Sequence, residues 1–220
     1  IANDTSINTL NSIPALVQKK NWKAELLTGF ILWESNAQRL VKDFNTLAQF
    51  NTTGIFVQDS TDILSQLATA IAIGLQAKTN VAFSVSVGTD FFIEQAKVKA
   101  LRAIWSEISS QEIFIHVRSN PWISESFQPH SNMLKSTTAA MAAIAGGCDA
   151  LTIYAEQESD TNMNRIARNV SNILREESHF NKVADATAGS YYIDALTQEI
   201  IKQVKSKLNL ESSASSLKPQ

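Results

Sequence analysis

Apolar runs of strand length alternate along this chain with segments of helical length, and this alternation limits its possible folds more than any other feature. The runs are rich in β-branched and aromatic residues, and the segments between them repeat apolar residues every three or four positions. Strands are expected at residues 54–57, 81–87, 113–117 and 150–154, with a less regular one at 27–33. Helices are expected at residues 36–49, 62–76, 91–108, 133–145, 163–177 and 195–208. The pattern predicts an α/β fold.

Strands that are separated by helices pair in parallel, and strands that are apolar at nearly every position belong to a sheet covered on both faces or closed into a barrel. A (β/α)8 TIM-type barrel needs about 250 residues. We therefore expect most of such a barrel, but not all of it, over residues 1–210, and the alternative is an open doubly wound sheet. The serine-rich residues 211–220 are expected to form a disordered tail.

Charge and cysteine content exclude several classes of protein. Nineteen Lys and Arg against 21 Asp and Glu give a net charge of −2, which lacks the basic excess of a nucleic-acid binder. No apolar run reaches the roughly 20 residues of a membrane span, so no membrane partner is expected. The single cysteine, Cys148, indicates a reducing compartment such as the cytoplasm. Ile rather than Met at position 1 suggests a processed chain or a piece of a longer one.

The ends of the predicted strands are the places where a parallel α/β fold carries its functional groups. These ends are residues 58–59, 88–90, 118–120 and 154–156, with Asp185 as a further candidate. His116 and Arg118 lie two residues apart on one strand, so both side chains point to one side, where they could meet an anionic ligand. The alternative is structural: the histidine bonds to a neighbouring strand or helix, and the arginine pairs with an acid.

Other patterns in the sequence mainly exclude common kinds of functional site. The sequence has no Gly-x-Gly-x-x-Gly and no Walker loop, so the usual nucleotide-binding turns are absent. Its three histidines lack metal-ligand spacing, and no metal site is expected. Gly146 and Gly147 are interpreted as the end of a helix, and Cys148 as a buried apolar residue. Arg165 and Arg168 share a helix face, where they either bind an anion or bridge to acids of a neighbouring helix.

Three stretches resemble the methylmalonyl-CoA mutase family. The longest runs from Arg-Ile-Ala-Arg-Asn at 165–169 through Val-Ala-Asp-Ala-Thr-Ala-Gly-Ser-Tyr-Tyr-Ile at 183–193. The others are Gly88 with residues 91–102, and Asn-Met-Leu-Lys-Ser-Thr at 132–137 with residues 142–147. The resemblance covers roughly residues 50–205. It implies a (β/α)8 barrel threaded by the coenzyme A chain of the substrate, beside a separate domain that carries adenosylcobalamin. By the same resemblance, this chain would be the later part of the barrel only.

The sequence departs from the family where the chemistry takes place. The family's Tyr-His pair is Ile55-Phe56 here, and these side chains cannot polarise a thioester carbonyl. The pattern His-x-Gln-Thr-Ser is His116-Val117-Arg118-Ser119-Asn120. We therefore expect no catalytic residue, with His116, Arg118, Ser119 and Asn120 as candidate substrate-binding residues. Asp-x-His-x-x-Gly, which supplies the cobalt ligand, does not occur, so adenosylcobalamin is expected in the complete enzyme but not on this chain.

These departures resemble the small, non-catalytic subunit of heterodimeric mutases, which supports a catalytic large subunit that interconverts methylmalonyl-CoA and succinyl-CoA. Two alternatives remain open. One is a competent acyl-CoA mutase whose cobalamin domain lies elsewhere, and the other is a coenzyme A-binding module without chemistry. A partial barrel also leaves unpaired strand edges, which predicts self-association.

Overall fold

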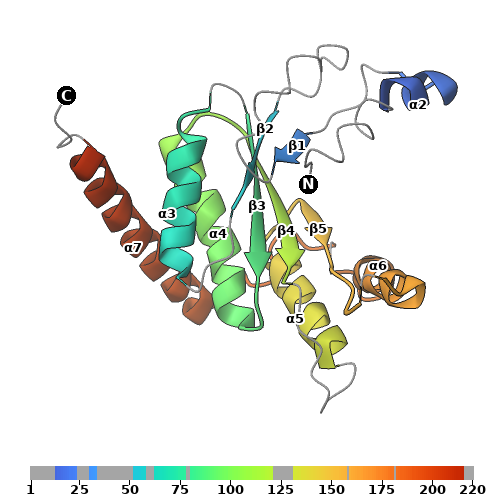
Figure 1. Ribbon diagram of the computed structural model, residues 1–220. Coiled ribbons are helices and arrows are strands. Elements are labelled where there is room, and N and C mark those ends of the chain that lie inside the picture. Colours follow the sequence, from blue (N-terminus) through green and yellow to red (C-terminus); the bar gives the residue numbers. More distant parts are fainter. Residues whose placement is uncertain are drawn as a thin grey trace.

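The computed structural model describes residues 13–23, 30–33, 52–57, 62–77, 80–120, 131–157, 159–180 and 182–215. Within these ranges the strands form one five-stranded parallel sheet (Figure 1). The strands are β1 (Phe30–Trp33), β2 (Thr52–Phe56), β3 (Val81–Val87), β4 (Ile113–Ser119) and β5 (Ala150–Thr152). All five predicted strands are confirmed, and the bounds of β3 are those expected.

The strand order in space is the order along the chain, β1-β2-β3-β4-β5. A doubly wound sheet reverses its strand order near the middle, and the described strands contain no such reversal. Because crossovers between parallel strands are right-handed, an unreversed order keeps the connecting helices on one face of the sheet. The described part of the sheet is therefore wound in one direction, which is consistent with part of a barrel.

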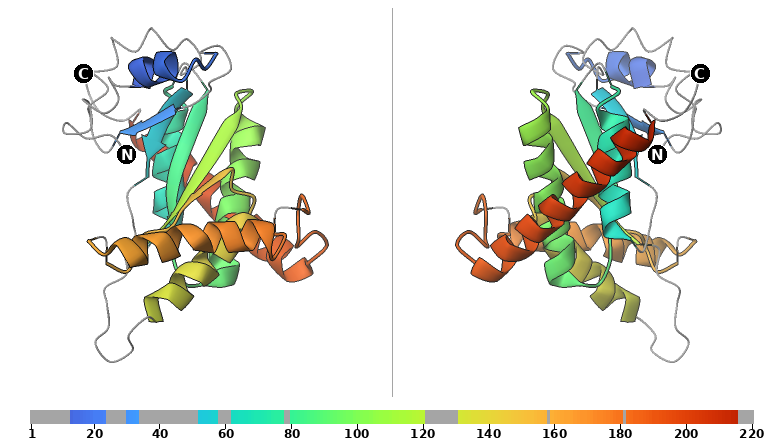
Figure 2. Two further views of the ribbon diagram at one scale, coloured as in Figure 1. Left: turned by 90° about the vertical axis from the view of Figure 1, so that its right-hand side faces the viewer. Right: turned by 90° about the vertical axis from the view of Figure 1, so that its left-hand side faces the viewer.

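The helices follow the predicted alternation. They are α2 (Ile13–Lys19), α3 (Ile63–Gly74), α4 (Phe91–Ile108), α5 (Ser131–Ala145), α6 (Thr161–Glu176) and α7 (Tyr191–Ser215). α3 and α4 cover the sheet, and α7 lies across both of them as an outer layer (Figure 2). None of the described helices is both long and apolar enough to span a bilayer.

The core lies between β3 and the helices α3 and α4. The Phe83 ring meets the Trp105 ring edge-on at 5.1 Å between centroids, and both side chains are fully buried. Gly74 ends α3 against the same pair, since a Cβ at this position would lie 2.7 Å from each ring. A larger residue at 74 would displace one of the two aromatic side chains.

Local signals explain where several helices begin and end. The Asp90 carboxylate caps α4 by accepting a hydrogen bond from the backbone N–H of Ile93, and Asp160 caps α6 through Asn162. Gly147 ends α5 with φ +86°, and the N–H of Cys148 returns to the Ala143 carbonyl. This left-handed turn confirms that the glycine pair ends a helix.

Two differences from the expected elements stand out. The last helix runs from Tyr191 to Ser215 rather than over 195–208, and its last residues, 211–215, overlap the segment for which a disordered tail is expected. Extending a formed helix by one residue gains a hydrogen bond without a new nucleation cost, which offsets the modest propensity of serine. Helix α2 was not predicted. The helix expected over 36–49 lies outside the described residues.

Candidate functional site

One face of the sheet carries a line of side chains that comes from four neighbouring strands. Since side chains alternate along a strand and Phe83 faces α4, its neighbour Ser84 faces away from these helices. Ser84 contacts His116 and Arg118 of β4, and these contact Thr152 of β5 and Phe56 of β2 in turn. We call these five residues the cross-strand row.

His116 is held at both ring nitrogens. Its Nδ1 lies 2.8 Å from the Ser84 hydroxyl, and its Nε2 lies 2.8 Å from the Thr152 hydroxyl. Burial, followed by the charge of Arg118, lowers the pKa of His116 to about 4. The ring is therefore neutral at pH 7, where one nitrogen donates and the other accepts a hydrogen bond.

Arg118 is buried against the backbone of the neighbouring strands. Its Nη2 donates to the Val57 carbonyl at 2.6 Å, and its Nη1 donates to the Ser84 carbonyl at 2.8 Å. The guanidinium also lies over the Phe56 ring, 3.9 Å from its centroid, and only 2% of the residue is exposed. A buried guanidinium needs such acceptors, so Arg118 ties β4 to the middle of β3 and to the residue that follows β2.

Ser119 and Asn120 do not join the cross-strand row. Ser119 is fully buried, and its hydroxyl accepts a hydrogen bond from the backbone N–H of Tyr154 at 2.9 Å. The side-chain oxygen of Asn120 is buried and accepts no hydrogen bond from the described residues. The structure thus brings together two of the four predicted substrate-binding residues, and a role in substrate binding stays a prediction for all four.

Ser84 and Thr152 were not predicted from the sequence as members of the site. The strand register could have revealed both residues, because Ser84 pairs with His116 and Thr152 pairs with Arg118. Register across parallel strands is set by packing over the whole sheet and is not readable from one strand alone.

Ile55 and Phe56 occupy opposite faces of β2. Ile55 is buried in the core beneath α3, and Phe56 lies under the Arg118 guanidinium. Neither side chain carries a hydrogen-bonding or titratable group. In this structure the pair contributes apolar packing and one cation–π contact.

The motif around Gly88 serves packing at the end of β3. Lys97 is buried, donates to the Ser86 carbonyl at 2.7 Å and forms an ion pair with Glu94. The Glu94 carboxylate lies against Gly88, where a Cβ would meet its oxygen at 3.0 Å. The glycine therefore leaves the room that this buried ion pair needs.

Asp185 is a surface anchor rather than a strand-end residue. Its carboxylate accepts hydrogen bonds from Lys99 of α4 at 2.7 and 2.8 Å and from the N–H of Thr187. The hydrogen bond from Lys99 is the main reason that the pKa of Asp185 is lowered. The Thr187 hydroxyl in turn accepts from Gln95 at 2.7 Å. Together these contacts fix the segment before α7 onto α4.

The remaining residues considered in the sequence lie outside the cross-strand row. Arg165 and Arg168 are exposed on α6, and neither makes an ion pair with a described residue, so the predicted bridge to a neighbouring helix is not seen there. Cys148 is partly buried against the core, and this burial raises the pKa of its thiol to about 12, as expected for an unreactive cysteine. No cluster of three or more potential metal ligands occurs among the described residues.

Comparison with known proteins identifies the family of this fold. Residues 64–211 match the family model described as methylmalonyl-CoA mutase. The chain belongs to the methylmalonyl-CoA mutase family. The matched segment includes His116, Arg118 and the loop that contains Asp185, whereas Ile55 and Phe56 precede it.

Individual relatives support the same family. The methylmalonyl-CoA mutase small subunit of Porphyromonas gingivalis is 35% identical over 136 residues, 56% of this chain and 22% of that protein. The methylmalonyl-CoA mutase of Escherichia coli is 32% identical over 160 residues, 66% of this chain and 22% of that protein. The mitochondrial methylmalonyl-CoA mutase of Bos taurus is 29% identical over 198 residues, 77% of this chain and 26% of that protein. The chain thus matches about a quarter of each relative's length.

Adenosylcobalamin is the cofactor that the family resemblance implies for the complete enzyme. A cobalt ligand would be a histidine with one free ring nitrogen, but His116 has both nitrogens bonded to hydroxyls. His179 lies in an exposed turn with φ +54° and not in the Asp-x-His-x-x-Gly pattern. The described residues therefore do not fit a cobalt site, and we assign no cofactor-dependent step to this chain.

Proposed function

We propose that this chain is part of the non-catalytic small subunit of a methylmalonyl-CoA mutase. In this role it supports a catalytic large subunit, which binds adenosylcobalamin and interconverts methylmalonyl-CoA and succinyl-CoA. The similarity to a protein named as a small subunit supports this role. The loss of the Tyr-His pair to Ile55-Phe56 supports it on chemical grounds, because transition-state charge would have no hydrogen-bond donor there.

One observation carries the proposal: the polar groups of the cross-strand row bond to one another and to the backbone. Arg118 donates to the Val57 and Ser84 carbonyls, and His116 is bonded at both nitrogens. A side chain that binds substrate must exchange these bonds for bonds to the ligand, which weakens net affinity. The row therefore favours a structural role over substrate binding.

The proposed fold of the complete subunit is a (β/α)8 barrel in the cytoplasm, to which this chain contributes the later strands. Its outer helix faces would contact the large subunit. The outer edges of β1 and β5 are the ends of the described sheet, and unpaired strand edges favour association with another chain. We therefore expect the isolated chain to self-associate. A light-scattering mass equal to one chain at high protein concentration would contradict this expectation.

The test is a turnover assay with methylmalonyl-CoA and adenosylcobalamin. The chain is assayed alone, and a catalytic large subunit is assayed with and without it. We expect no turnover by the chain alone, co-elution with the large subunit in gel filtration, and turnover only when the large subunit is present. Succinyl-CoA formed by the chain alone would overturn the proposal in favour of a competent mutase.

A further inference from the structure

Four aromatic residues lie where α4 and α7 begin, at the end of the sheet to which β3 runs (Figure 1). The Phe92 ring meets the Phe91 ring edge-on at 5.4 Å between centroids and the Tyr192 ring at 5.5 Å. Tyr191 precedes Tyr192 in the first turn of α7. We call Phe91, Phe92, Tyr191 and Tyr192 the aromatic patch. None of the four belongs to the cross-strand row.

The aromatic patch is held in place but left open to solvent. Hydrogen bonds from Lys99 to Asp185 fix the segment before α7 onto α4, so the two helix starts that carry the patch are joined. Phe92 is nevertheless 49% exposed, Tyr192 61% and Tyr191 91%. A side chain as exposed as that of Tyr191 contributes little packing to the fold, and exposed patches of this kind mark interaction sites.

The surroundings of the aromatic patch are acidic. The segments that carry it, residues 86–96 and 183–201, contain five Asp and Glu and no Lys or Arg. Asp194 is exposed and lies one helical turn from Tyr191, on the same side of α7. Asp90 caps α4 directly before the patch. Neither Asp90 nor Asp194 forms an ion pair with a described residue, so these carboxylates favour a cation from outside the chain.

Arginine is the side chain that matches both the rings and the carboxylates. A guanidinium stacks on aromatic faces and binds a carboxylate through two parallel hydrogen bonds, and Arg118 over Phe56 shows the first of these contacts within this fold. Tyrosine and arginine are also enriched among the residues that dominate binding energy at protein interfaces. A nucleic acid or an anionic lipid surface would be repelled by Asp90 and Asp194. The aromatic patch therefore favours a protein partner that presents arginine.

We propose that the aromatic patch is the docking surface for the large subunit, which presents an arginine side chain to Tyr191, Tyr192 and Asp194. This inference rests on the proposed small-subunit role, because it names the surface through which the chain would act. The patch follows β3, the middle strand of the described sheet. It is therefore separate from the edges of β1 and β5, which favour self-association.

Binding of the full chain to the catalytic large subunit of the same enzyme, measured by biolayer interferometry, tests the surface. Tyr191→Ala and Tyr192→Ala should each weaken binding at least about tenfold. Leu134→Ala is the matched control, because Leu134 is an apolar residue of α5 that is 74% exposed, and its affinity should stay within about twofold of the unsubstituted chain. All three substitutions are at exposed positions, so circular dichroism should show an unchanged fold.

The contribution of charge is tested by Asp194→Asn, which keeps the size of the side chain. This variant should weaken binding about threefold to fivefold at low salt, and the difference should shrink in 0.5 M salt because salt screens exposed charges. Glu176→Gln, at the exposed end of α6 where Glu176 pairs with Arg175, is the control and should leave the affinity unchanged. An Asp194 variant that binds as tightly as the unsubstituted chain would overturn the assignment of arginine.

The remaining outcomes separate this inference from the role on which it rests. If the large subunit binds the unsubstituted chain and both tyrosine variants equally, the docking surface is overturned and the small-subunit role stands. If the large subunit does not bind the unsubstituted chain, both fail. Photo-cross-linking with Tyr191→benzoylphenylalanine should join the chain to the large subunit. Cross-links found only between two copies of this chain would overturn the inference and assign the aromatic patch to self-association.

Discussion

The two faces of the sheet are built on different principles. Toward α3 and α4, β3 and β4 present apolar side chains, and the Phe83–Trp105 contact lies at the centre of a fully buried core. On the other face, Ser84, His116 and Arg118 form hydrogen bonds across strands at 2.8 to 3.2 Å. Apolar packing tolerates exchange of residues of similar volume, whereas buried polar groups require each partner in place. Apolar packing thus stabilises the face toward the helices, and specific hydrogen bonds stabilise the opposite face.

The largest expected effect is the loss of volume on the helix face. Trp105→Ala should lower the free energy of unfolding by about 3–5 kcal/mol, because it removes the largest buried side chain of the core and leaves a cavity. Chemical denaturation measures the change. Trp22→Ala is the matched control, since Trp22 is 53% exposed and should cost less than about 1 kcal/mol. Equal losses of stability in both variants would show that Trp105 does not lie in the core.

Removing the guanidinium on the opposite face should have a smaller but substantial effect. Arg118→Ala removes the side-chain donor of the Val57 carbonyl and one of the two donors of the Ser84 carbonyl, which still accepts from the Val57 N–H, and it uncovers the Phe56 ring. We expect a loss of about 2–3 kcal/mol in the same denaturation experiment. Arg175→Ala serves as control because the Arg175 side chain is 61% exposed, and it should stay within about 0.5 kcal/mol. If Arg118→Ala were as stable as this control, the structural role of the cross-strand row would be contradicted.

Acidification should loosen the same face through His116. The pKa of His116 is lowered from 6.5 to about 4, so the unfolded chain binds the proton first as pH falls. Stability should therefore be complete above pH 6.5 and decrease between pH 6.5 and 4, by about 1–2 kcal/mol for a partly exposed group. Thermal melts at pH 7 and pH 5 measure this decrease. His116→Gln should make stability nearly independent of pH between 6.5 and 4. If stability still fell as steeply in that variant, other groups would be responsible for the decrease.

The smallest effect is expected outside both faces. Lys99→Met removes the ion pair with Asp185, whose side chain is 42% exposed, and surface pairs contribute about 0–1 kcal/mol. The difference from the unsubstituted chain should shrink further in 1 M salt. A loss as large as that of Arg118→Ala would mean that the segment before α7 contributes more to the fold than the sheet's polar face does.

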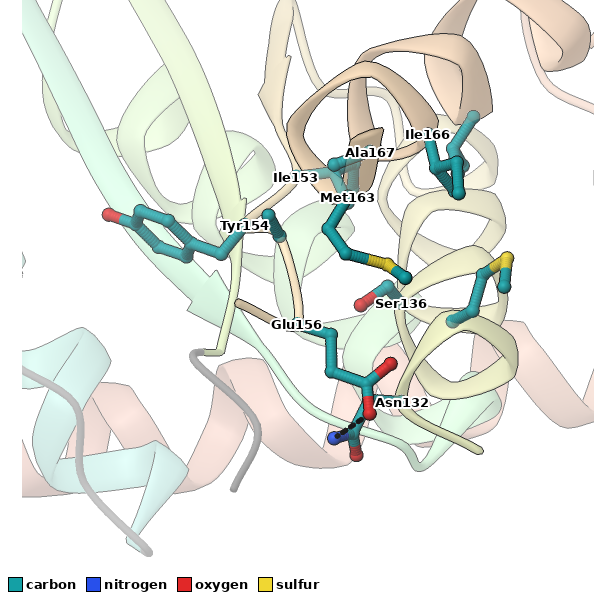
Figure 3. A pocket seen from close by; sticks show the side chains of 11 residues that line it. Asn132, Ser136, Ile153, Tyr154, Glu156, Met163, Ile166 and Ala167 are labelled. Atoms are coloured by element: carbon teal, nitrogen blue, oxygen red, sulfur yellow. Dashed lines mark hydrogen bonds between the residues drawn. The ribbon is translucent and has the colours of Figure 1, made fainter. Parts of the chain in front are cut away.

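The elements were predictable because their signals are local. The alternating apolar runs and the Gly146-Gly147 stop lie within single elements, so β3 and α4 have the expected bounds. The site was predictable only in part. Alternation placed His116 and Arg118 on one side, but their contacts with Ser84, Thr152 and the Val57 carbonyl depend on the strand register. A pocket between α5 and α6 (Figure 3) is lined by residues 154–156, one of the expected strand ends, and by Met133 of α5 and Met163 of α6, which helix packing brings there.

Calorimetric titration of the chain with methylmalonyl-CoA tests the central claim, that the cross-strand row serves the fold and not a substrate. We expect no heat of binding at pH 7 for the unsubstituted chain and none for Arg118→Ala. Micromolar binding that Arg118→Ala weakens at least about tenfold, with the variant still folded by circular dichroism, would contradict it. That result would make His116 and Arg118 ligand-binding residues of a coenzyme A site.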